Sequence, residues 1–369
     1  MKIKKACCAV AVAAAVAAGV SLWMRHDPDE GYCVRMRLNS ARERTETIDG
    51  IRWHYGIVDG KALIVKAVRR GSGPFSDKLT LPAELGGCPV RAVCGSVFRQ
   101  DDPVRSLTIP EGVTKIFENT FAGVKLESVS IPASVTNISS NAVSSKTIKE
   151  YVVSPDNPKF CAINKMILTK DGEELVCGVS GDVKIPEGVK RIPGWAFSNT
   201  TVTSVEIPVG LESLGDGAFD DCTELKSVSI SPGVKVIPAF AFQGCLSLER
   251  VDLPPGVTNI NAYAFEGCKS LKSIVIPEGV VQLEHHSFAN CANLESVTIP
   301  STVKYIACHA FSACSRKLKV TANIRDAKIS IGAFSAVNDL SEYRGVNRKG
   351  FERDGEGRLT FDGKVLNGH

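Results

Sequence analysis

The chain lacks a large excess of charge of either sign. Its 369 residues include 44 Lys and Arg against 40 Asp and Glu, a net charge of +4, and these charges are interspersed along the sequence. Nucleic-acid-binding domains usually concentrate positive charge on one face, so this balance argues against a nucleic-acid partner. The basic clusters at Arg35–Arg44 and Arg344–Arg353 are interpreted as solvated end segments.

Short catalytic and metal-binding motifs are also missing. The sequence contains no G-x-S-x-G, no H-E-x-x-H and no phosphate-binding glycine loop, which are local signatures of hydrolases, zinc proteases and nucleotide enzymes. No C-x-x-C pair has the spacing of a zinc site. We therefore expect a protein without enzymatic activity and without a cofactor.

A single long uncharged run, from Ala6 to Met24, follows a lysine-rich start. This order is typical of a secretory signal peptide, and Ala15–Ala17 offers a cleavage site. The run is 19 residues long and could also just span a bilayer uncleaved. Residues 1–30 are thus predicted to be a signal peptide or an N-terminal membrane anchor. The remaining chain is expected to be exported, with membrane contact only through this segment if it is uncleaved.

Two columns of residues recur with a spacing of 23. One column is phenylalanine, and the other is cysteine three positions later. The members are Phe219, Phe242, Phe265, Phe288, Phe311 and Phe334, with Cys222, Cys245, Cys268, Cys291 and Cys314. A fixed period of this size is the signature of a solenoid, in which stacked coils share one core.

The repeat unit reads F-x-x-C-x-x-L-x-x-V-x-I-P-x-G-V-x-x-I-x-x-x-A. Its V-x-I segment predicts a strand with Val228 and Ile230 inward and the serines around them outward. Proline and glycine then end the strand. The apolar spacing between Val234 and Phe242 predicts a short helical or 3₁₀ segment on the opposite wall. The expected fold is an α/β, β-rich solenoid with a parallel sheet on one face.

The period is broken once, because 54 residues separate Val143 from Phe197 in the phenylalanine column. Two strand-like stretches in this interval, Lys165–Thr169 and Glu174–Cys177, flank a turn. We interpret residues 154–182 as a β-hairpin insert. Insertions in repeat arrays often decorate a functional face.

Residues 31–87 lack the repeat but include two strand-like stretches, Ile51–Tyr55 and Ala62–Lys66. An array needs a terminal element over the apolar end of its first coil, so we interpret this region as an N-terminal β cap. A separate binding module is the alternative. The solenoid is expected to span residues 88–337 with about ten coils, and residues 338–369 to form a C-terminal cap or tail.

The cysteine column is interpreted as a ladder of buried thiols. Equivalent residues on neighbouring coils are about 5 Å apart, so an occasional disulfide is geometrically conceivable. A regular column of small, readily buried side chains is more simply explained by packing.

The outward positions of the predicted strands form an exposed polar surface. The candidate ligand-binding residues are Ser204, Glu206, Ser227, Ser229, Arg250, Asp252, Ser273, Ser296 and Thr298. Small hydroxyls offer hydrogen bonds but little buried area, and aromatic anchors are missing there. Such a surface favours weak or multivalent contacts. The alternative is a merely soluble β face.

Four residues next to this surface alternate in sign on successive coils: Lys226, Glu249, Lys272 and Glu295. Opposite charges on neighbouring strands favour one register. We interpret this column as structural.

Four residues form the one weak candidate for a metal site: His285, His286, Cys308 and His309. One period separates His286 from His309 and His285 from Cys308, which would place them on adjacent coils. Earlier coils have glycine, phenylalanine and tyrosine in the column of His286, so packing is the competing interpretation.

The unit FQGCLSLERVDLPPGVTNI, from Phe242 to Ile260, and its neighbours resemble the BspA-type leucine-rich repeat, a class of bacterial surface proteins. The resemblance covers roughly residues 80–335. Pro-x-Gly replaces the asparagine of the ordinary leucine-rich repeat, and the last coil loses the signature at Ser315–Leu318. The resemblance implies a cell-surface or secreted protein that binds an extracellular or surface protein or a glycan, without a cofactor. A structural spacer or display scaffold without a specific ligand is the alternative.

Overall fold

The computed structural model describes most of the chain between residues 43 and 334. The described ranges are 43–69, 76–143, 145–315, 317–322, 324, 327–330 and 332–334, with strands β29 (Phe351–Arg353), β30 (Leu359–Phe361) and β31 (Lys364–Val365). The chain divides into two units, Met1–Val34 and Arg35–His369. The predicted signal or anchor segment lies outside the described residues, which belong to the second unit. No helix capable of crossing a bilayer occurs among them.

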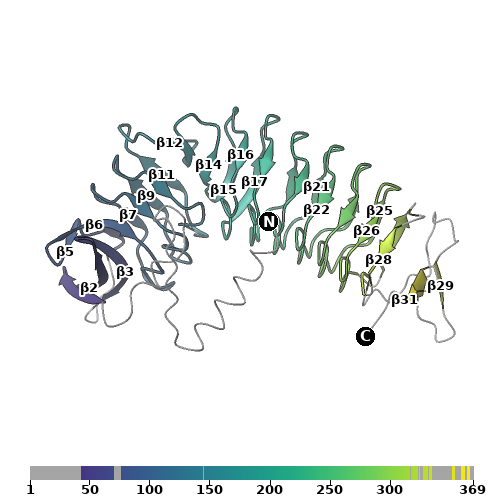
Figure 1. The fold of residues 1–369 in the computed structure, drawn as a ribbon, viewed down its shortest axis with the longest axis horizontal. Coiled ribbons are helices and arrows are strands. Elements are labelled where there is room, and N and C mark those ends of the chain that lie inside the picture. The colour runs from purple at the N-terminus through teal and green to yellow at the C-terminus, as the bar shows by residue number, and fades with distance from the viewer. Residues whose placement is uncertain are drawn as a thin grey trace. The chain divides into compact units, whose positions relative to one another are not determined.

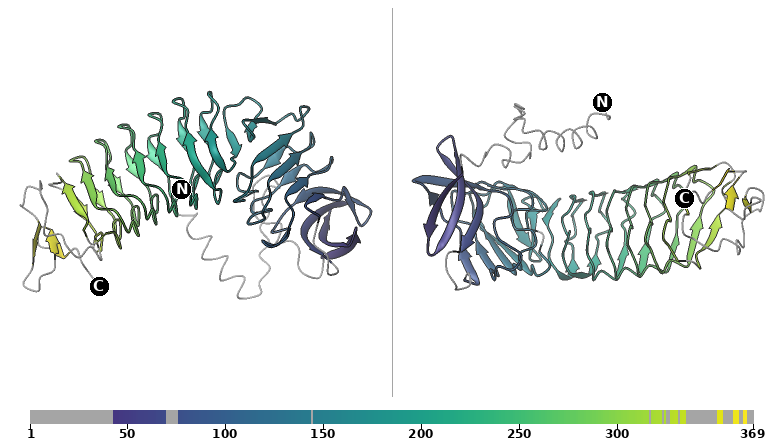
Figure 2. Two further views of the ribbon diagram at one scale, coloured as in Figure 1. Left: turned by 180° about the vertical axis from the view of Figure 1, so that it is seen from behind. Right: turned by 90° about the horizontal axis from the view of Figure 1, so that it is seen from below.

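The coils form two walls of parallel strands, and most coils contribute one strand to each wall (Figure 1). The first wall contains β4 (Lys78–Thr80), β7 (Ser106–Thr108), β9 (Ser128–Ile131), β11 (Glu150–Val153), β15 (Gly181–Lys184), β17 (Val202–Glu206), β19 (Ser227–Ser229), β21 (Arg250–Asp252), β23 (Ser273–Val275), β25 (Ser296–Ile299) and β27 (Lys319–Ala322). The second wall contains β6 (Cys88–Val93), β8 (Lys115–Ile116), β10 (Asn137–Ile138), β16 (Arg191–Ile192), β18 (Ser213–Leu214), β20 (Val236–Ile237), β22 (Asn259–Ile260), β24 (Gln282–Leu283), β26 (Tyr305–Ile306) and β28 (Lys328–Ile329). Figure 2 shows the coils following one another in one stack.

The 23-residue spacing sets the register of the first wall. Val228 lies opposite Val251 on the next coil, and Ile274 lies opposite Val297. All four side chains are buried, whereas the residues on either side of them point outward. A strand exposes alternate residues, so a constant repeat length keeps every apolar position on the core side.

The predicted helical or 3₁₀ segment on the opposite wall is wrong. The described part of the chain contains no helix, and Val236–Ile237 pairs in parallel with Asn259–Ile260 instead. An α-helix is about 10 Å wide, whereas neighbouring strands are about 4.8 Å apart. Short strands joined by turns let both walls advance by the same small step, so the fold is a β-solenoid of about ten coils.

The phenylalanine column forms a stack of rings inside the solenoid. From Phe197 to Phe334, successive ring centroids are 4.9 to 5.4 Å apart and the ring planes differ by at most 9°. These rings are buried. Their spacing matches the step between strands, so each ring packs against the same face of its neighbour.

The five cysteines of the column are buried and free, as the packing interpretation requires. Each thiol donates a hydrogen bond to the main-chain carbonyl of the phenylalanine one coil earlier. For example, Cys245 Sγ lies 3.2 Å from the carbonyl oxygen of Phe219, and Cys314 Sγ lies 3.1 Å from that of Phe288. The column therefore joins coils through polar contacts as well as filling space.

Three antiparallel strands precede the first coil, β1 (Arg44–Ile48), β2 (Ile51–Val58) and β3 (Lys61–Arg69). Strand β3 pairs in parallel with β6, so this region extends the second wall. Trp53 packs edge-on against Phe98 at a centroid distance of 6.5 Å. Whether the region acts as a cap remains a prediction. A small strand β5 (Glu84–Leu85) pairs antiparallel with β6.

The interrupted interval contains an antiparallel sheet of β12 (Phe160–Ile163), β13 (Met166–Thr169) and β14 (Leu175–Cys177). Strands β13 and β14 occupy the two stretches expected to be strand-like, whereas β12 was not predicted. Glu174 forms a parallel bridge with Arg191, which returns the chain to the second wall.

Candidate functional site

The structure places all nine candidate ligand-binding residues on the outer side of the first wall. Each of them is exposed. Ser227 lies opposite Arg250, Ser229 opposite Asp252, and Ser273 opposite Ser296. We call the outward side chains of β15, β17, β19, β21, β23 and β25 the polar face.

The N-terminal end of the polar face is already occupied by contacts within the protein. Asp182 Oδ1 accepts hydrogen bonds from Thr203 Oγ1 at 2.6 Å and Ser204 Oγ at 2.8 Å. These two bonds lower the pKa of the Asp182 carboxyl below its ordinary value. On the same strands, Lys184 Nζ lies 3.3 Å from Glu206 Oε2. A ligand here would have to replace these contacts.

The middle of the polar face carries one ion pair within a strand. Arg250 Nε donates to Asp252 Oδ1 at 2.9 Å. The side chains are 75% and 50% exposed, and an exposed pair of this kind contributes little to stability. Both groups keep bonding capacity toward solvent, because a guanidinium has five N–H donors and a carboxylate has two oxygens.

The remaining hydroxyls of the polar face are exposed. Among the described residues, no side-chain hydrogen bond is made by any member of a set that we call the hydroxyl stripe. The set is Ser227, Ser229, Ser273, Ser296 and Thr298. Val275 lies within this stripe and is 67% exposed. The stripe therefore offers free donors and acceptors around an apolar side chain.

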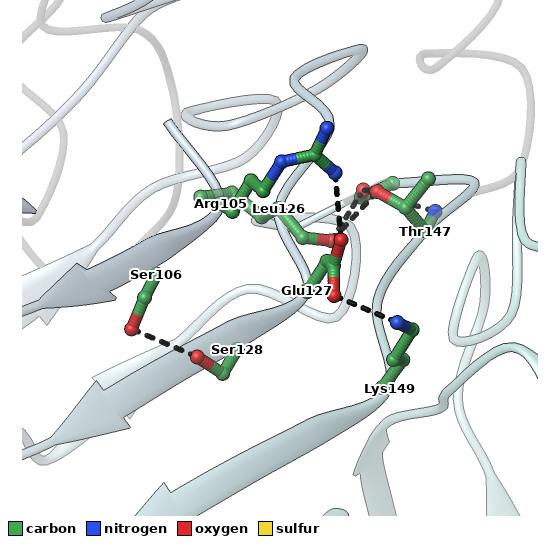
Figure 3. Close-up of polar contacts among 8 residues, drawn as sticks. Arg105, Ser106, Leu126, Glu127, Ser128, Thr147 and Lys149 are labelled. Carbon is green, nitrogen blue, oxygen red and sulfur yellow. Dashed lines mark hydrogen bonds and ion pairs between the residues drawn. The ribbon is translucent and has the colours of Figure 1, made fainter. Parts of the chain in front are cut away.

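A three-residue ion-pair chain lies beside the first wall at earlier coils. Glu127 accepts from Arg105 Nη1 and from Lys149 Nζ, both at 2.7 Å (Figure 3). The bond from Lys149 and, to a smaller extent, the bond from Arg105 lower the pKa of the Glu127 carboxyl. Ser128 Oγ also donates to Ser106 Oγ at 2.9 Å. Sequence reasoning missed the charged residues Arg105, Glu127 and Lys149, although their spacing of 22 residues was a usable signal.

The predicted charge column behaves differently from that group. No ion pair within 4 Å joins its described members, Lys226, Glu249, Lys272 and Glu295. All four are exposed, so solvent screens their attraction. The expected ladder of direct contacts is therefore not formed, and main-chain pairing and the core set the register there.

The four residues of the weak metal candidate do lie together on adjacent coils. His285 Nδ1 is 2.8 Å from Cys308 Sγ, and the rings of His286 and His309 stack with centroids 5.1 Å apart. Burial, followed by the nearby His309, lowers the pKa of His286. Across the described ranges, no group of three or more His, Cys, Asp or Glu side chains is arranged to hold a metal ion.

A second ring stack, which we call the corner column, includes the column of His286, for which packing was the interpretation that competed with metal binding. It consists of Trp195, Phe240, Tyr263, His286 and His309, whose rings stack at 4.8 to 6.2 Å. Each residue has a left-handed backbone, with φ between 56° and 64°, which is costly for a side chain larger than hydrogen. Ring stacking offsets part of this cost. Phe240, Tyr263, His286 and His309 follow one another at a spacing of 23 residues, whereas Trp195 lies 45 residues before Phe240.

A protein-family model matches the repeats of this chain. The model for the BspA type leucine-rich repeat region matches residues 91–165, 177–269 and 235–346. No curated protein matches the chain.

Solved structures with a similar fold include bacterial leucine-rich repeat proteins. One from Eubacterium ventriosum ATCC 27560 is 20% identical, covers 79% of this chain and 94% of its own, and has a TM-score of 0.53. A leucine-rich cell surface protein from Faecalibacterium prausnitzii A2-165 is 23% identical, with coverages of 78% and 95% and a TM-score of 0.44. The pneumococcal vaccine antigen PcpA is 16% identical, with coverages of 82% and 93% and a TM-score of 0.43. The repeats and the fold show that this chain belongs to the BspA-type leucine-rich repeat family.

Proposed function

We propose that this protein is an exported, non-enzymatic repeat protein that binds macromolecules through the polar face. The ligand class is an extracellular or surface protein or a glycan, and no cofactor takes part. The observation that carries the proposal is the hydroxyl stripe, whose side chains are exposed and make no side-chain hydrogen bond to another described residue.

The stripe favours a repetitive ligand. Ser227, Ser273 and Ser296 occupy equivalent outward positions on their strands, and strands of one wall are about 4.8 Å apart. Single hydroxyl contacts are weak, so useful affinity requires several of them at once. A glycan or a protein with evenly spaced polar groups would make such contacts.

A surface location supports this role. The lysine-rich start and uncharged run of residues 1–30 fit a signal peptide or membrane anchor. A structural neighbour of low identity is described as a cell surface protein. Mass spectrometry of the mature N-terminus would distinguish a cleaved signal from an uncleaved anchor.

Binding arrays of glycans and extracellular-matrix proteins test the proposal. The triple variant S227K/S273K/S296K adds three charges to the stripe, and we expect it to lose every ligand that the wild-type protein retains. A matched control, S213K/V236K/N259K, adds the same charges to outward positions of β18, β20 and β22 on the second wall. We expect the control to keep binding. Equal loss in both variants, or no ligand for the folded wild-type protein, would contradict recognition by the polar face.

The second candidate function is a spacer or display scaffold without a specific ligand. It is favoured by the N-terminal end of the polar face, where Asp182, Ser204 and Glu206 already have partners within the protein. Under this alternative, the triple lysine variant changes neither binding nor display.

A further inference from the structure

One thiol in the array differs from the others in what it faces. The structure describes ten cysteines, all free, of which seven are buried. Every buried thiol donates to a main-chain carbonyl oxygen, at 3.1 to 3.6 Å. These thiols are buried from solvent and hydrogen-bonded, so we expect them to be unreactive.

The three half-buried thiols belong to Cys88, Cys161 and Cys308. Cys161 donates to the carbonyl of Thr169 at 3.4 Å, and burial raises the pKa of its thiol. Cys308 faces an imidazole instead, with its Sγ 2.8 Å from Nδ1 of His285. The neutral ring accepts the thiol proton at Nδ1 when its own proton is on Nε2.

The 23-residue repeat creates this pair. His285 and Cys308 occupy the same position on adjacent coils, so the stacking of coils brings their side chains together. His285 is exposed and Cys308 is half-buried, which leaves the sulfur open to a small reagent. A nucleophile within hydrogen-bond reach of a base is the arrangement that activates cysteine.

We propose that Cys308 and His285 form a thiol-modification site that captures a low-molecular-weight disulfide as a mixed disulfide. His285 Nδ1 takes the proton of the Cys308 thiol, and the sulfur attacks one sulfur of the incoming disulfide. A new S–S bond forms to Cys308 while the S–S bond of the reagent breaks. The second half of the reagent leaves as a thiolate and takes the proton from the imidazolium. One disulfide replaces another, so no further oxidant or reductant is needed.

The test measures reaction rates of the folded full-length protein with 5,5′-dithiobis(2-nitrobenzoic acid), an aromatic disulfide, and assigns sites by peptide mass spectrometry. We expect Cys308 to react at least about tenfold faster than Cys88 and Cys161, because its thiol has a base beside it. In denaturant, where His285 no longer faces the sulfur, the three rates should converge. A Cys308 rate no greater than those of the other two half-buried thiols overturns the proposal.

Two histidine variants separate base catalysis from simple exposure. H285Q should slow the reaction of Cys308 about tenfold. The matched control H309Q alters the ring that stacks on His286 and should change the rate less than about twofold. Mere loosening of the fold exposes thiols and raises their rates, so a slower rate reports loss of the base. Free imidazole should restore the rate of H285A. A Cys308 rate that is unchanged in H285Q, or that fails to respond to imidazole in H285A, contradicts the role of His285.

Discussion

The regular coils and the interrupted coil solve the same packing problem in different ways. Between Phe197 and Phe334, each coil supplies a phenylalanine ring and its neighbour covers it. Between Val143 and Gly178, the phenylalanine column has no phenylalanine. Tyr151 and Phe160 are 2% and 7% exposed there, so large side chains outside the phenylalanine column contribute to the core. The core is therefore filled by one repeated side chain in the regular coils and by side chains from other positions in the interrupted coil.

The polar contacts of the two regions differ in the same way. The regular coils use a repeated bond from each cysteine thiol to a phenylalanine carbonyl. In the interrupted coil, the side chain of buried Asn157 takes part in four hydrogen bonds. Its amide nitrogen donates to the carbonyls of Pro132 and Val135, and its oxygen accepts from the main chain of Lys159 and Phe160. Removing one polar contact should therefore destabilise the regular coils only modestly. Removing Asn157 should destabilise the interrupted coil more.

The largest loss is expected from removing one ring of the regular stack. F265A leaves a cavity between Phe242 and Phe288, which are 5.3 and 5.1 Å from the Phe265 ring centroid. We expect about 3–5 kcal/mol lower unfolding free energy in urea. V143A, in the interrupted coil, removes fewer atoms and should cost less than half as much. Equal losses would show that the stack has no special role.

Asn157 should be the most sensitive polar residue of the interrupted coil. N157D cannot donate to the Pro132 and Val135 carbonyls and places negative charge beside them, so we expect a loss of about 3 kcal/mol. Hydrogen exchange should speed up mainly in β12 and β13. The exposed control N293D should change stability by less than about 0.5 kcal/mol. Uniform loosening of all coils would contradict this local role.

The junction between the two regions requires a glycine at position 178, because there is no room for a Cβ next to Phe197. A Cβ at this position would lie 2.1 Å from Cδ1 of Phe197, so G178A must displace the first ring of the regular stack. We expect about 1–3 kcal/mol of destabilisation. G210A is the control, because a Cβ there meets no atom within 4 Å. A thermal melt in which both variants match the wild-type protein would refute the packing argument.

The thiol bonds of the regular coils should each contribute modestly. C245A removes a small buried group and leaves the Phe219 carbonyl without its thiol donor, so we expect about 1–2 kcal/mol of destabilisation. The half-buried thiol of Cys308 has no such bond, and C308A should be nearly neutral. Urea unfolding of the two variants side by side makes the comparison. A neutral C245A would mean that the thiol only fills space.

The last expected effect is a pH dependence of stability at the start of the regular coils. Burial, with the neighbouring Asp221 charge, raises the pKa of Asp220 from 3.8 to about 7. Between these values the folded protein holds a proton that the unfolded chain has released, so stability should fall as pH rises from about 4 to about 7. D220N should remove this slope and leave the variant more stable than the wild-type protein above neutral pH. Melting temperatures at a series of pH values measure it, and identical slopes would show that Asp220 does not titrate in this way.

Much of the array was predictable because its signals are periodic. The inward Val228 and the outward Ser227 follow from strand alternation and a constant repeat length. The return segment was predicted wrongly, because the strand Val236–Ile237 is only two residues long and too short to show a period of two. Helix and strand spacings are indistinguishable over so few residues.

Among the candidate sites, sequence reasoning located the polar face but not its internal partners. The exposure of Ser227 and Ser296 was predictable from register. The Asp182 bonds to Thr203 and Ser204 were not, since they depend on side-chain conformations between coils. The left-handed backbone of the corner column also gave no direct signal, because large residues such as Tyr263 are unusual in that conformation.

The order of residues along this chain specifies a stack of similar coils, because a step of 23 residues returns each apolar side chain to the same place above its predecessor. Folding in three dimensions settles which groups meet across the step. It pairs Cys245 with the carbonyl of Phe219 and Cys308 with His285, and it leaves the hydroxyl stripe without a side-chain hydrogen bond to any other described residue. The physical reason is distance: coils about 5 Å apart bring into contact side chains that are more than twenty residues apart in sequence.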